Sequence, residues 1–441
     1  MMKMHSGLIA CFFCALWLFV TPSQAGMGWL SDVPEACRQA KAQHKDLMVV
    51  YKGSNWEKTE DRDIKNMLSC EAVMKPWTDQ FVLLELSHPQ AGQDDDATTL
   101  LILADENNRP YYALNTSSLK QGAYWISEEI GFSKLVREKV ASLFSKLPGL
   151  QGNDRFRLMG EILQIVNDNG NAVDVSQPYI DWVKELKEKD KQDVSGYKKY
   201  TRQQGEIFNQ WAQFLVQSNS IRMDCDEQGL DEKTKDEKMK ALWTSIVSDP
   251  QLSPQLRLLV YCLVGIKSEL GDIFSSKTEQ DMMPVSEKIV RRIEEISPGS
   301  RGAYLLGKKI PSFLLAYAIF TEMEEMLKAG KYDEILQKLE EGEKKLPCDN
   351  SIQSNYMLVR GKILIMKGEM DDGLAAIEKA AELMAFSERG RQIEGYLFKF
   401  RENRELILEL LKEKQQGNSS REQQLKELLF IMLNMEFMIP L

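Results

Sequence analysis

Histidine and cysteine are scarce in this chain of 441 residues, which has three histidines and seven cysteines, and the five cysteines beyond residue 25 form no C-x-x-C pair. A dithiol oxidoreductase needs two neighbouring thiols, because one sulfur attacks a disulfide and the second resolves the mixed intermediate. A zinc site or a Ser–His–Asp triad needs partners at workable positions, and His44 and His88 stand alone in the sequence. The sequence therefore contains no familiar enzyme motif and implies no metal ion and no cofactor.

Excess positive charge and long apolar runs are also lacking. The formal net charge is −10 with both signs interspersed, so no basic surface for nucleic acid or an anionic membrane is expected. The glycines occur singly, which excludes a phosphate-binding loop. Beyond the first 25 residues no stretch approaches the roughly 18 apolar residues of a membrane span. We therefore expect a soluble globular protein with no nucleic-acid partner and no transmembrane span in the mature chain.

Residues 1–25 have the pattern of a cleavable signal peptide. A positive charge precedes an apolar stretch over residues 8–20, and small residues then lead to a cut after Ala25. The apolar stretch is too short for a spanning helix. Cys11 and Cys14 lie inside it and not at a cleavage position, so a lipoprotein anchor is not expected. We expect export, and the alternative is an uncleaved N-terminal anchor.

Residues 26–148 alternate between helical and strand-like patterns, which predicts an α+β unit. Short apolar runs bounded by turn residues indicate strands, and apolar residues at helical spacing indicate helices. Asp105 to Asn108 form a turn signal between two of the runs, which predicts a hairpin. The expected helices cover residues 34–43, 63–74 and 132–147, and the expected strands cover 47–51, 81–86, 99–103 and 109–114.

The stretch Gly53-Ser54-Asn55-Trp56 follows the first of these strands and precedes a helical pattern that continues to Met74. It resembles the Gly-Ser-Asp-Trp-Cys-x-x-Cys site of secreted bacterial thioredoxin-like proteins. The resemblance covers about 120 residues and implies a thioredoxin-like mixed sheet with flanking helices, in the periplasm or secreted. Glu57 and Glu60 occupy the two cysteine positions, so the expected active site is degenerate.

The altered positions have a structural interpretation and a functional one. A carboxylate suits a helix N-terminus, and Ser54 with Glu57 reads as a capping box, so these residues would hold the helix start. The functional alternative makes Glu57 and Glu60 an acid–base pair or part of a metal site. Thr98 occupies the place of the family's cis-proline, and we expect a trans bond there. Together the changes predict that the redox activity of this site is lost.

Five cysteines remain after export, and most are expected to be buried small hydrophobic residues. Cys70 follows Glu60 by ten residues, about 15 Å along a helix, which is too far for a resolving thiol. Cys70 and Cys37 are nevertheless the candidate thiols for an alternative oxidoreductase or isomerase. Trp56 is either a core residue or an anchor for a partner peptide. The five cysteines are Cys37, Cys70, Cys225, Cys262 and Cys348.

From about residue 149 the strand patterns stop and amphipathic helices follow, which predicts an all-α helical-repeat domain. Residues 149–313 form one helical part, which is either unrelated to the repeats or made of degenerate ones. In residues 314–441 a spacing of 38 recurs and resembles a pair of tetratricopeptide-type helical hairpins. The matched positions are Gly330 with Gly368, Tyr332 with Met370, and Leu336 with Leu374.

The last 14 residues, 428–441, are mostly apolar and are expected to dock on the protein's own helices, or else on another subunit or the membrane surface. The leading hypothesis is an exported, non-catalytic scaffold that binds a protein or peptide. The alternatives are a thiol–disulfide oxidoreductase and an envelope chaperone. The oligomeric state and the identity of the partner are left open.

Overall fold

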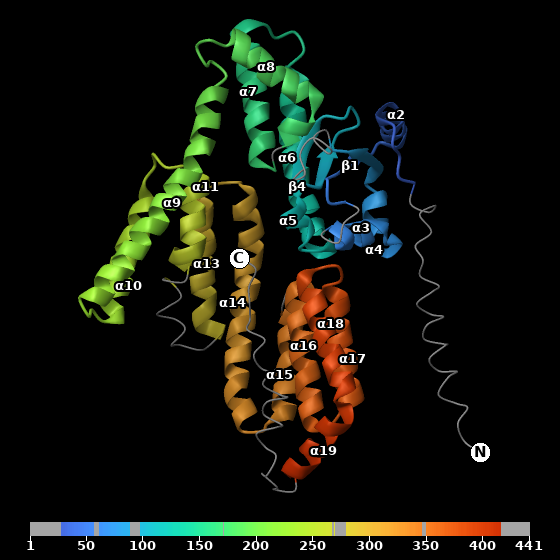
Figure 1. Cartoon of the computed structure of the whole chain (residues 1–441), viewed down its shortest axis with the longest axis vertical. Coiled ribbons are helices and arrows are strands. Elements are labelled where there is room, and N and C mark those ends of the chain that lie inside the picture. The colour runs from blue at the N-terminus through green and yellow to red at the C-terminus, as the bar shows by residue number, and fades with distance from the viewer. Residues whose placement is uncertain are drawn as a thin grey trace.

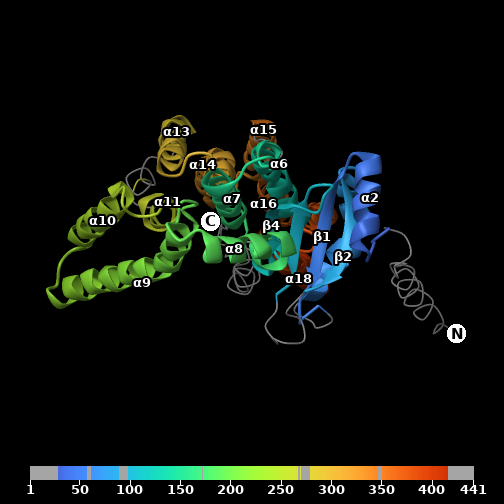
Figure 2. The ribbon, with the colours of Figure 1, turned by 90° about the horizontal axis from the view of Figure 1, so that it is seen from above.

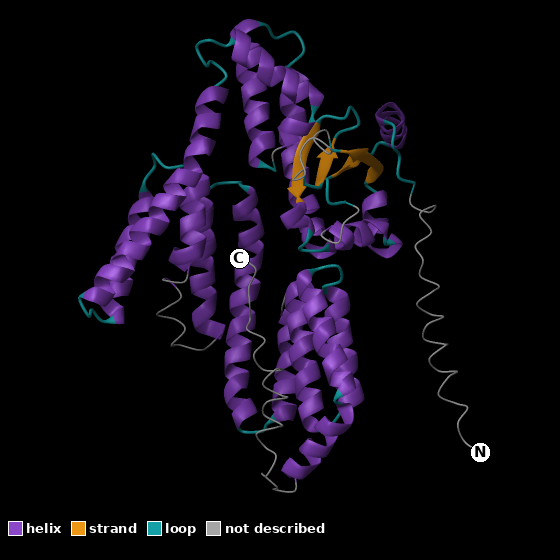
Figure 3. Ribbon diagram, viewed as in Figure 1, coloured by secondary structure: helices purple, strands orange, loops and turns teal. Residues whose placement is uncertain are grey.

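The computed structural model describes residues 28–56, 61–88, 98–170, 172–266, 269, 279–345 and 350–415. An N-terminal unit with a small sheet is followed by helices only (Figures 1 and 3). This order confirms the prediction of an α+β unit followed by an all-α region. The expected signal peptide, Glu57, Glu60, Cys348 and residues 428–441 lie outside the described residues.

The sheet has four strands in the order β2-β1-β3-β4. β1 and β2 are parallel, whereas β3 runs antiparallel to both of its neighbours. β1 is buried on both faces, as its run of apolar residues predicts. The strands are β1 Asp46–Lys52, β2 Phe81–Ser87, β3 Leu100–Ala104 and β4 Pro110–Asn115. The helices of this unit are α2 Val33–Gln43, α3 Arg62–Ser69, α4 Glu71–Thr78, α5 Thr116–Leu119 and α6 Ala123–Lys146.

Two helices of the N-terminal unit differ from the sequence prediction. The expected helix over 63–74 is two short helices, because Cys70 between them has an extended backbone with ψ 110°. The closing helix α6 begins nine residues earlier than expected, directly after Gly122. Gly122 has φ 90°, a conformation that favours glycine and that turns the chain into α6.

The core of the N-terminal unit continues past residue 148. Tyr179 and Val173 pack into it, and the Tyr179 hydroxyl donates a hydrogen bond of 2.6 Å to the Pro110 carbonyl in β4. The Ala113 amide donates to the Asn169 carbonyl at 2.9 Å, so the segment after α7 closes the outer edge of β4. The elements that follow α6 are α7 Gly152–Asp168, η2 Ala172–Val175 and α8 Gln177–Lys189.

The middle helices form a separate core and include a hairpin that projects from the body (Figures 1 and 2). This hairpin, here called the arm, consists of α9 and α10. It is joined to the body through α11 and α7, with which α9 is in contact. The elements are α9 Tyr197–Glu227, α10 Glu232–Ser248, α11 Pro254–Val260, η3 Tyr261–Gly265 and α13 Glu279–Ile296.

The spacing of 38 residues corresponds to a repeated helix–turn–helix. Gly330 and Gly368 both have positive φ, 68° and 93°, at the ends of α14 and α16. The amide that follows each glycine bonds back to the carbonyl five residues earlier, a Schellman motif that only a left-handed residue closes well. Leu374 is buried, and Leu336 is half-buried in the equivalent place. Tyr332 and Met370 open the following helices of the two units.

Helix α14 contributes to two cores. Its first half packs with α11 and α13, and its second half packs with α15 and α16. The boundary predicted at residue 313 therefore falls within one continuous helix. The final helices are α14 Arg301–Lys328, α15 Tyr332–Lys345, α16 Asn350–Lys367, α17 Met370–Leu383, α18 Glu388–Glu402 and α19 Arg404–Gln415.

Candidate functional site

The turn after β1 is where the sequence predicts the site. Gly53 to Trp56 leave the sheet in a turn, and the Trp56 side chain is only 8% exposed within the core of the N-terminal unit. This burial favours the core-packing interpretation of Trp56. Because Glu57 and Glu60 lie outside the described residues, their roles as caps, acid–base pair or metal ligands stay predictions.

A buried hydrogen-bond network closes this turn. The Thr99 hydroxyl donates to the Asp61 carboxylate at 2.5 Å and accepts from the Gly53 amide at 3.1 Å. Asp61 is 2% exposed and Thr99 is fully buried, whereas the neighbouring Thr98 is exposed. A buried carboxylate needs a donor, and Thr99 supplies one. Sequence reasoning singled out Thr98 and missed Thr99 and Asp61.

The cysteines are dispersed over the fold. Cys37 lies on α2 and Cys70 lies between α3 and α4, and no disulfide joins any of the cysteines among the described residues. Burial raises the pKa of the Cys37 thiol and raises that of Cys262 to about 12. A raised pKa lowers the fraction of thiolate, the reactive form. These two thiols are therefore not activated as nucleophiles.

The chain's own C-terminal hairpins contact the N-terminal unit beside this turn. A side chain at Gly122 would meet Ser387 Cβ at 3.1 Å and the Ala385 carbonyl at 3.2 Å, so the turn between α17 and α18 fits closely against it. Arg391 of α18 forms an ion pair with Asp63 in the first turn of α3. The helix that starts at the predicted site is thus held by an element more than 300 residues away in the sequence.

A buried ion pair forms a second joint between the N-terminal unit and the helices. Glu129 of α6 is fully buried, and its two carboxylate oxygens accept from Arg301 Nε of α14 at 3.0 and 2.9 Å. The Tyr112 hydroxyl also donates to Glu129, and burial raises the pKa of Tyr112 well above its ordinary value. Burying the Glu129 charge is costly, and the hydrogen bonds from Arg301, whose side chain is 29% exposed, and from Tyr112 offset this cost.

A groove of about 780 Å³ lies directly beside this ion pair, with one wall from α6 and α7 and the other from α11 and the start of α14. We call it the junction groove. Two of its leucines are exposed, Leu135 at 53% and Leu259 at 38%. Its volume falls in the range of ligand-binding clefts. Other lining residues are Val136, Lys139, Ile165, Asp168, Gln255, Leu258, Cys262 and Leu306.

Polar groups border the apolar floor of the junction groove. Asp168 Oδ1 accepts from the Tyr200 hydroxyl at 2.8 Å and from Gln255 Nε2 at 3.1 Å. Burial raises the pKa of Asp168, while these hydrogen bonds oppose the shift. Lys139 lies on the same wall as Leu135, one helical turn away. The groove thus combines apolar contacts with oriented polar groups.

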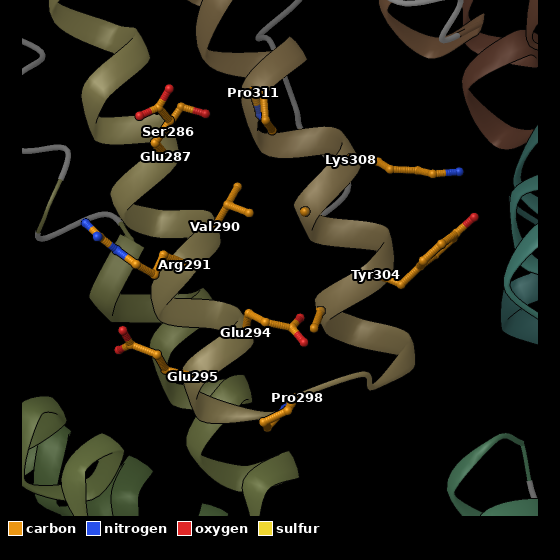
Figure 4. Close-up of a pocket in the computed structure, with 12 residues that line it drawn as sticks. Ser286, Glu287, Val290, Arg291, Glu294, Glu295, Pro298, Tyr304, Lys308 and Pro311 are labelled. Atoms are coloured by element: carbon orange, nitrogen blue, oxygen red, sulfur yellow. The ribbon is translucent and has the colours of Figure 1, made fainter. Parts of the chain in front are cut away.

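A second groove of about 830 Å³ runs along α13 and α14 (Figure 4). Val290 and Glu294 of α13 face α14, where Gly307 leaves room for them. Tyr304 and Lys308 point to the other side of α14, and Lys308 donates to Glu128 of α6 at 3.3 Å. The α13–α14 groove therefore has fewer inward polar groups than the junction groove.

No cluster of three metal-ligating side chains occurs in the described part of the chain. Within α14, Arg301–Phe320 is long and apolar enough to cross a membrane, but 59% of its most apolar window is buried in the fold, as in a core helix.

No protein-family model, curated protein or solved structure matches the chain.

Proposed function

We propose that this protein is an exported, non-catalytic scaffold that binds protein segments in the junction groove. Its N-terminal unit is thioredoxin-like with a degenerate active site, and its C-terminal hairpins are tetratricopeptide-like. Support for the first part is the element order α–β–α–β–β–β–α, which the sheet and its helices follow. Support for the second is the pair of equivalent Schellman turns at Gly330 and Gly368.

The observation that carries the proposal is the exposure of Leu135 and Leu259 in a formed groove. Large apolar side chains that are exposed in a concave surface mark interaction sites more often than single apolar side chains scattered over a surface do. The rim of Lys139, Asp168 and Gln255 offers both donors and acceptors to a peptide backbone. The expected ligand is therefore an extended segment with leucine-like side chains and unsatisfied backbone groups, such as an unfolded chain presents.

Binding to a reduced and carboxymethylated unfolded protein tests this proposal. The variant Leu135→Asp/Leu259→Asp places two charges in the groove, and we expect it to weaken binding by at least about 30-fold, the effect of losing a central interface anchor. Leu263→Asp is the matched control, because Leu263 is 48% exposed and does not line the groove. Equal binding by the two variants would reject the groove as the site.

A disulfide-reduction assay separates the scaffold from the oxidoreductase alternative. The scaffold proposal expects no turnover of a disulfide-bonded protein substrate, since the turn after β1 has glutamates in place of thiols. Turnover that is lost in Cys70→Ser or Cys37→Ser would reject it. If the protein still suppresses client aggregation after all its thiols are alkylated, the scaffold acts as a chaperone.

A further inference from the structure

Helix α9 has an unusual distribution of charge for a helix at the surface. Its 31 residues begin with a basic turn and end with an acidic one. The 15 residues between them, 207–221, contain no charged side chain. An exposed helix normally carries charge along its solvent face, so an uncharged middle indicates a face that is covered.

Four large apolar side chains are exposed on this helix. Phe208 is 75% exposed, Val216 65%, Met223 63% and Leu215 44%. At 100° per residue these four positions fall within about 100° of one another, on one face. The fold uses the adjoining face, where Phe214, Ser218 and Cys225 are buried. The exposed stripe is therefore additional to the contacts that hold the arm together.

We propose that α9 is a dimerisation surface, on which a second copy of this chain packs its own α9 in the antiparallel direction. The antiparallel register follows from the positions of the exposed residues. When Leu215 lies opposite Val216 of the partner subunit, Phe208 lies opposite Met223 of the partner subunit. Each large side chain then meets another across a two-fold axis. The arm projects from the body, which leaves room for this approach (Figures 1 and 2).

Charge complementarity selects the antiparallel orientation. Arg202, whose side chain is 72% exposed, and the exposed Glu227 lie on the same flank of the stripe, at opposite ends. In an antiparallel pair the same flanks face each other, so each Arg202 approaches Glu227 of the partner subunit. In a parallel pair the facing flanks are opposite ones and the two copies of Arg202 lie at the same height, so Arg202 would not meet Glu227 of the partner subunit. Among the residues that the structure describes, Arg202 forms a single ion-pair contact, at 4.0 Å with Glu206 in its own helix.

The size of the contact predicts a weak dimer. From Phe208 to Met223 the stripe is about 22 Å long at 1.5 Å per residue. One pair of helices of this length buries less than the roughly 800 Å² per partner of a standard interface. The measurement therefore needs protein concentrations up to about 200 µM, well above those at which standard-sized interfaces associate.

Sedimentation equilibrium of the full mature chain tests the surface. We expect concentration-dependent dimers, and a dissociation constant at least about 100-fold higher in Phe208→Glu/Val216→Glu. Phe398→Glu is the matched control, because Phe398 is 61% exposed on α18, away from the arm. Unchanged far-UV circular dichroism confirms that the variants fold. A wild-type monomer at every concentration, or equal dissociation constants for the two variants, would overturn the proposal.

Charge reversal tests the orientation independently. Arg202→Glu and Glu227→Arg each create two like-charge contacts in an antiparallel dimer, and each should weaken it by roughly 10-fold. An equimolar mixture of the two variants restores both opposite-charge contacts in the heterodimer, which should associate more tightly than either variant alone. No gain on mixing would overturn the antiparallel arrangement. The stripe is separate from the junction groove, so failure here leaves the proposed function standing.

Discussion

The turn after β1 and the junction groove differ in whether their side chains already have partners within the fold. At the turn, Trp56 is buried, Asp61 has a donor in Thr99, and Arg391 of α18 forms an ion pair with Asp63 of the neighbouring helix. In the groove, Leu135 and Leu259 remain exposed beside oriented polar groups. The contacts at the turn stabilise the fold. The exposed leucines of the groove can still bury apolar surface against a ligand. This difference is the reason that we place the proposed binding site at the groove and not at the turn.

Removing the ion pair beside the groove should have the largest effect on stability. Glu129→Ala leaves Arg301, whose side chain is 29% exposed, without its carboxylate and removes the acceptor of the buried Tyr112 hydroxyl, which should cost about 2–4 kcal/mol in the free energy of unfolding. Urea unfolding followed by circular dichroism measures it. Glu128→Ala on the same helix removes only a partly exposed pair with Lys308 and should cost less than about 1 kcal/mol. Equal losses would show that the Glu129–Arg301 pair does not hold the groove walls together.

Opening the network at the turn should have the next largest effect. Thr99→Val keeps the shape of the side chain but leaves the buried Asp61 carboxylate without its donor, at a cost of about 1–3 kcal/mol. Thr98→Val is the control, since Thr98 is exposed and should be nearly neutral. Client binding should be unchanged in both variants. Loss of client binding in Thr99→Val alone would move the binding site to the turn.

Lys362 provides a pH-dependent contrast with the half-buried Arg301, because it is buried and forms no ion pair with an acid among the described residues. It is 8% exposed on α16, and burial, followed by the charge of Arg389, lowers its pKa from 10.5 to about 8. The unfolded chain therefore binds more protons than the native one between pH 8 and 10.5, so stability should rise with pH through that window.

The variant Lys362→Met should remove this pH dependence. It should also stabilise the protein at pH 7 by on the order of 2 kcal/mol, because a charge no longer has to be buried there. Urea midpoints at pH 7, 9 and 10.5 measure both effects against Lys379→Met, which changes an exposed lysine on α17. If the stability of Lys362→Met rises with pH as steeply as that of the wild type, the pH dependence does not come from Lys362.

Local sequence patterns predicted much of the fold. The apolar run of β1, the hairpin turn at Asp105 and the glycines at 330 and 368 act through neighbouring residues, so their effect is visible in the sequence. The Glu129–Arg301 pair and the network at the turn were not predictable, because Glu129 and Arg301 are 172 residues apart and Asp61 and Thr99 are 38 apart. The junction groove was missed for the same reason, since its walls come from helices far apart in the chain.

The prediction that the protein is exported can be tested independently of the binding site. Intact mass of the protein from its native compartment, alkylated with and without reduction, should fit cleavage after Ala25 and five free thiols in both samples. A mass that retains residues 1–25 would contradict the cleavable signal. Two missing alkyl groups before reduction would reveal a disulfide and reopen the redox alternative.

Hydrogen–deuterium exchange of the mature chain, with and without the unfolded client, tests directly whether the client binds in the junction groove. We predict that the client slows exchange in α6 around Leu135 and in α11 around Leu259, and leaves exchange in β1 and in the turn from Gly53 to Trp56 unchanged. Slower exchange at that turn, with none in α6 or α11, would contradict it and return the site to the edge of the sheet.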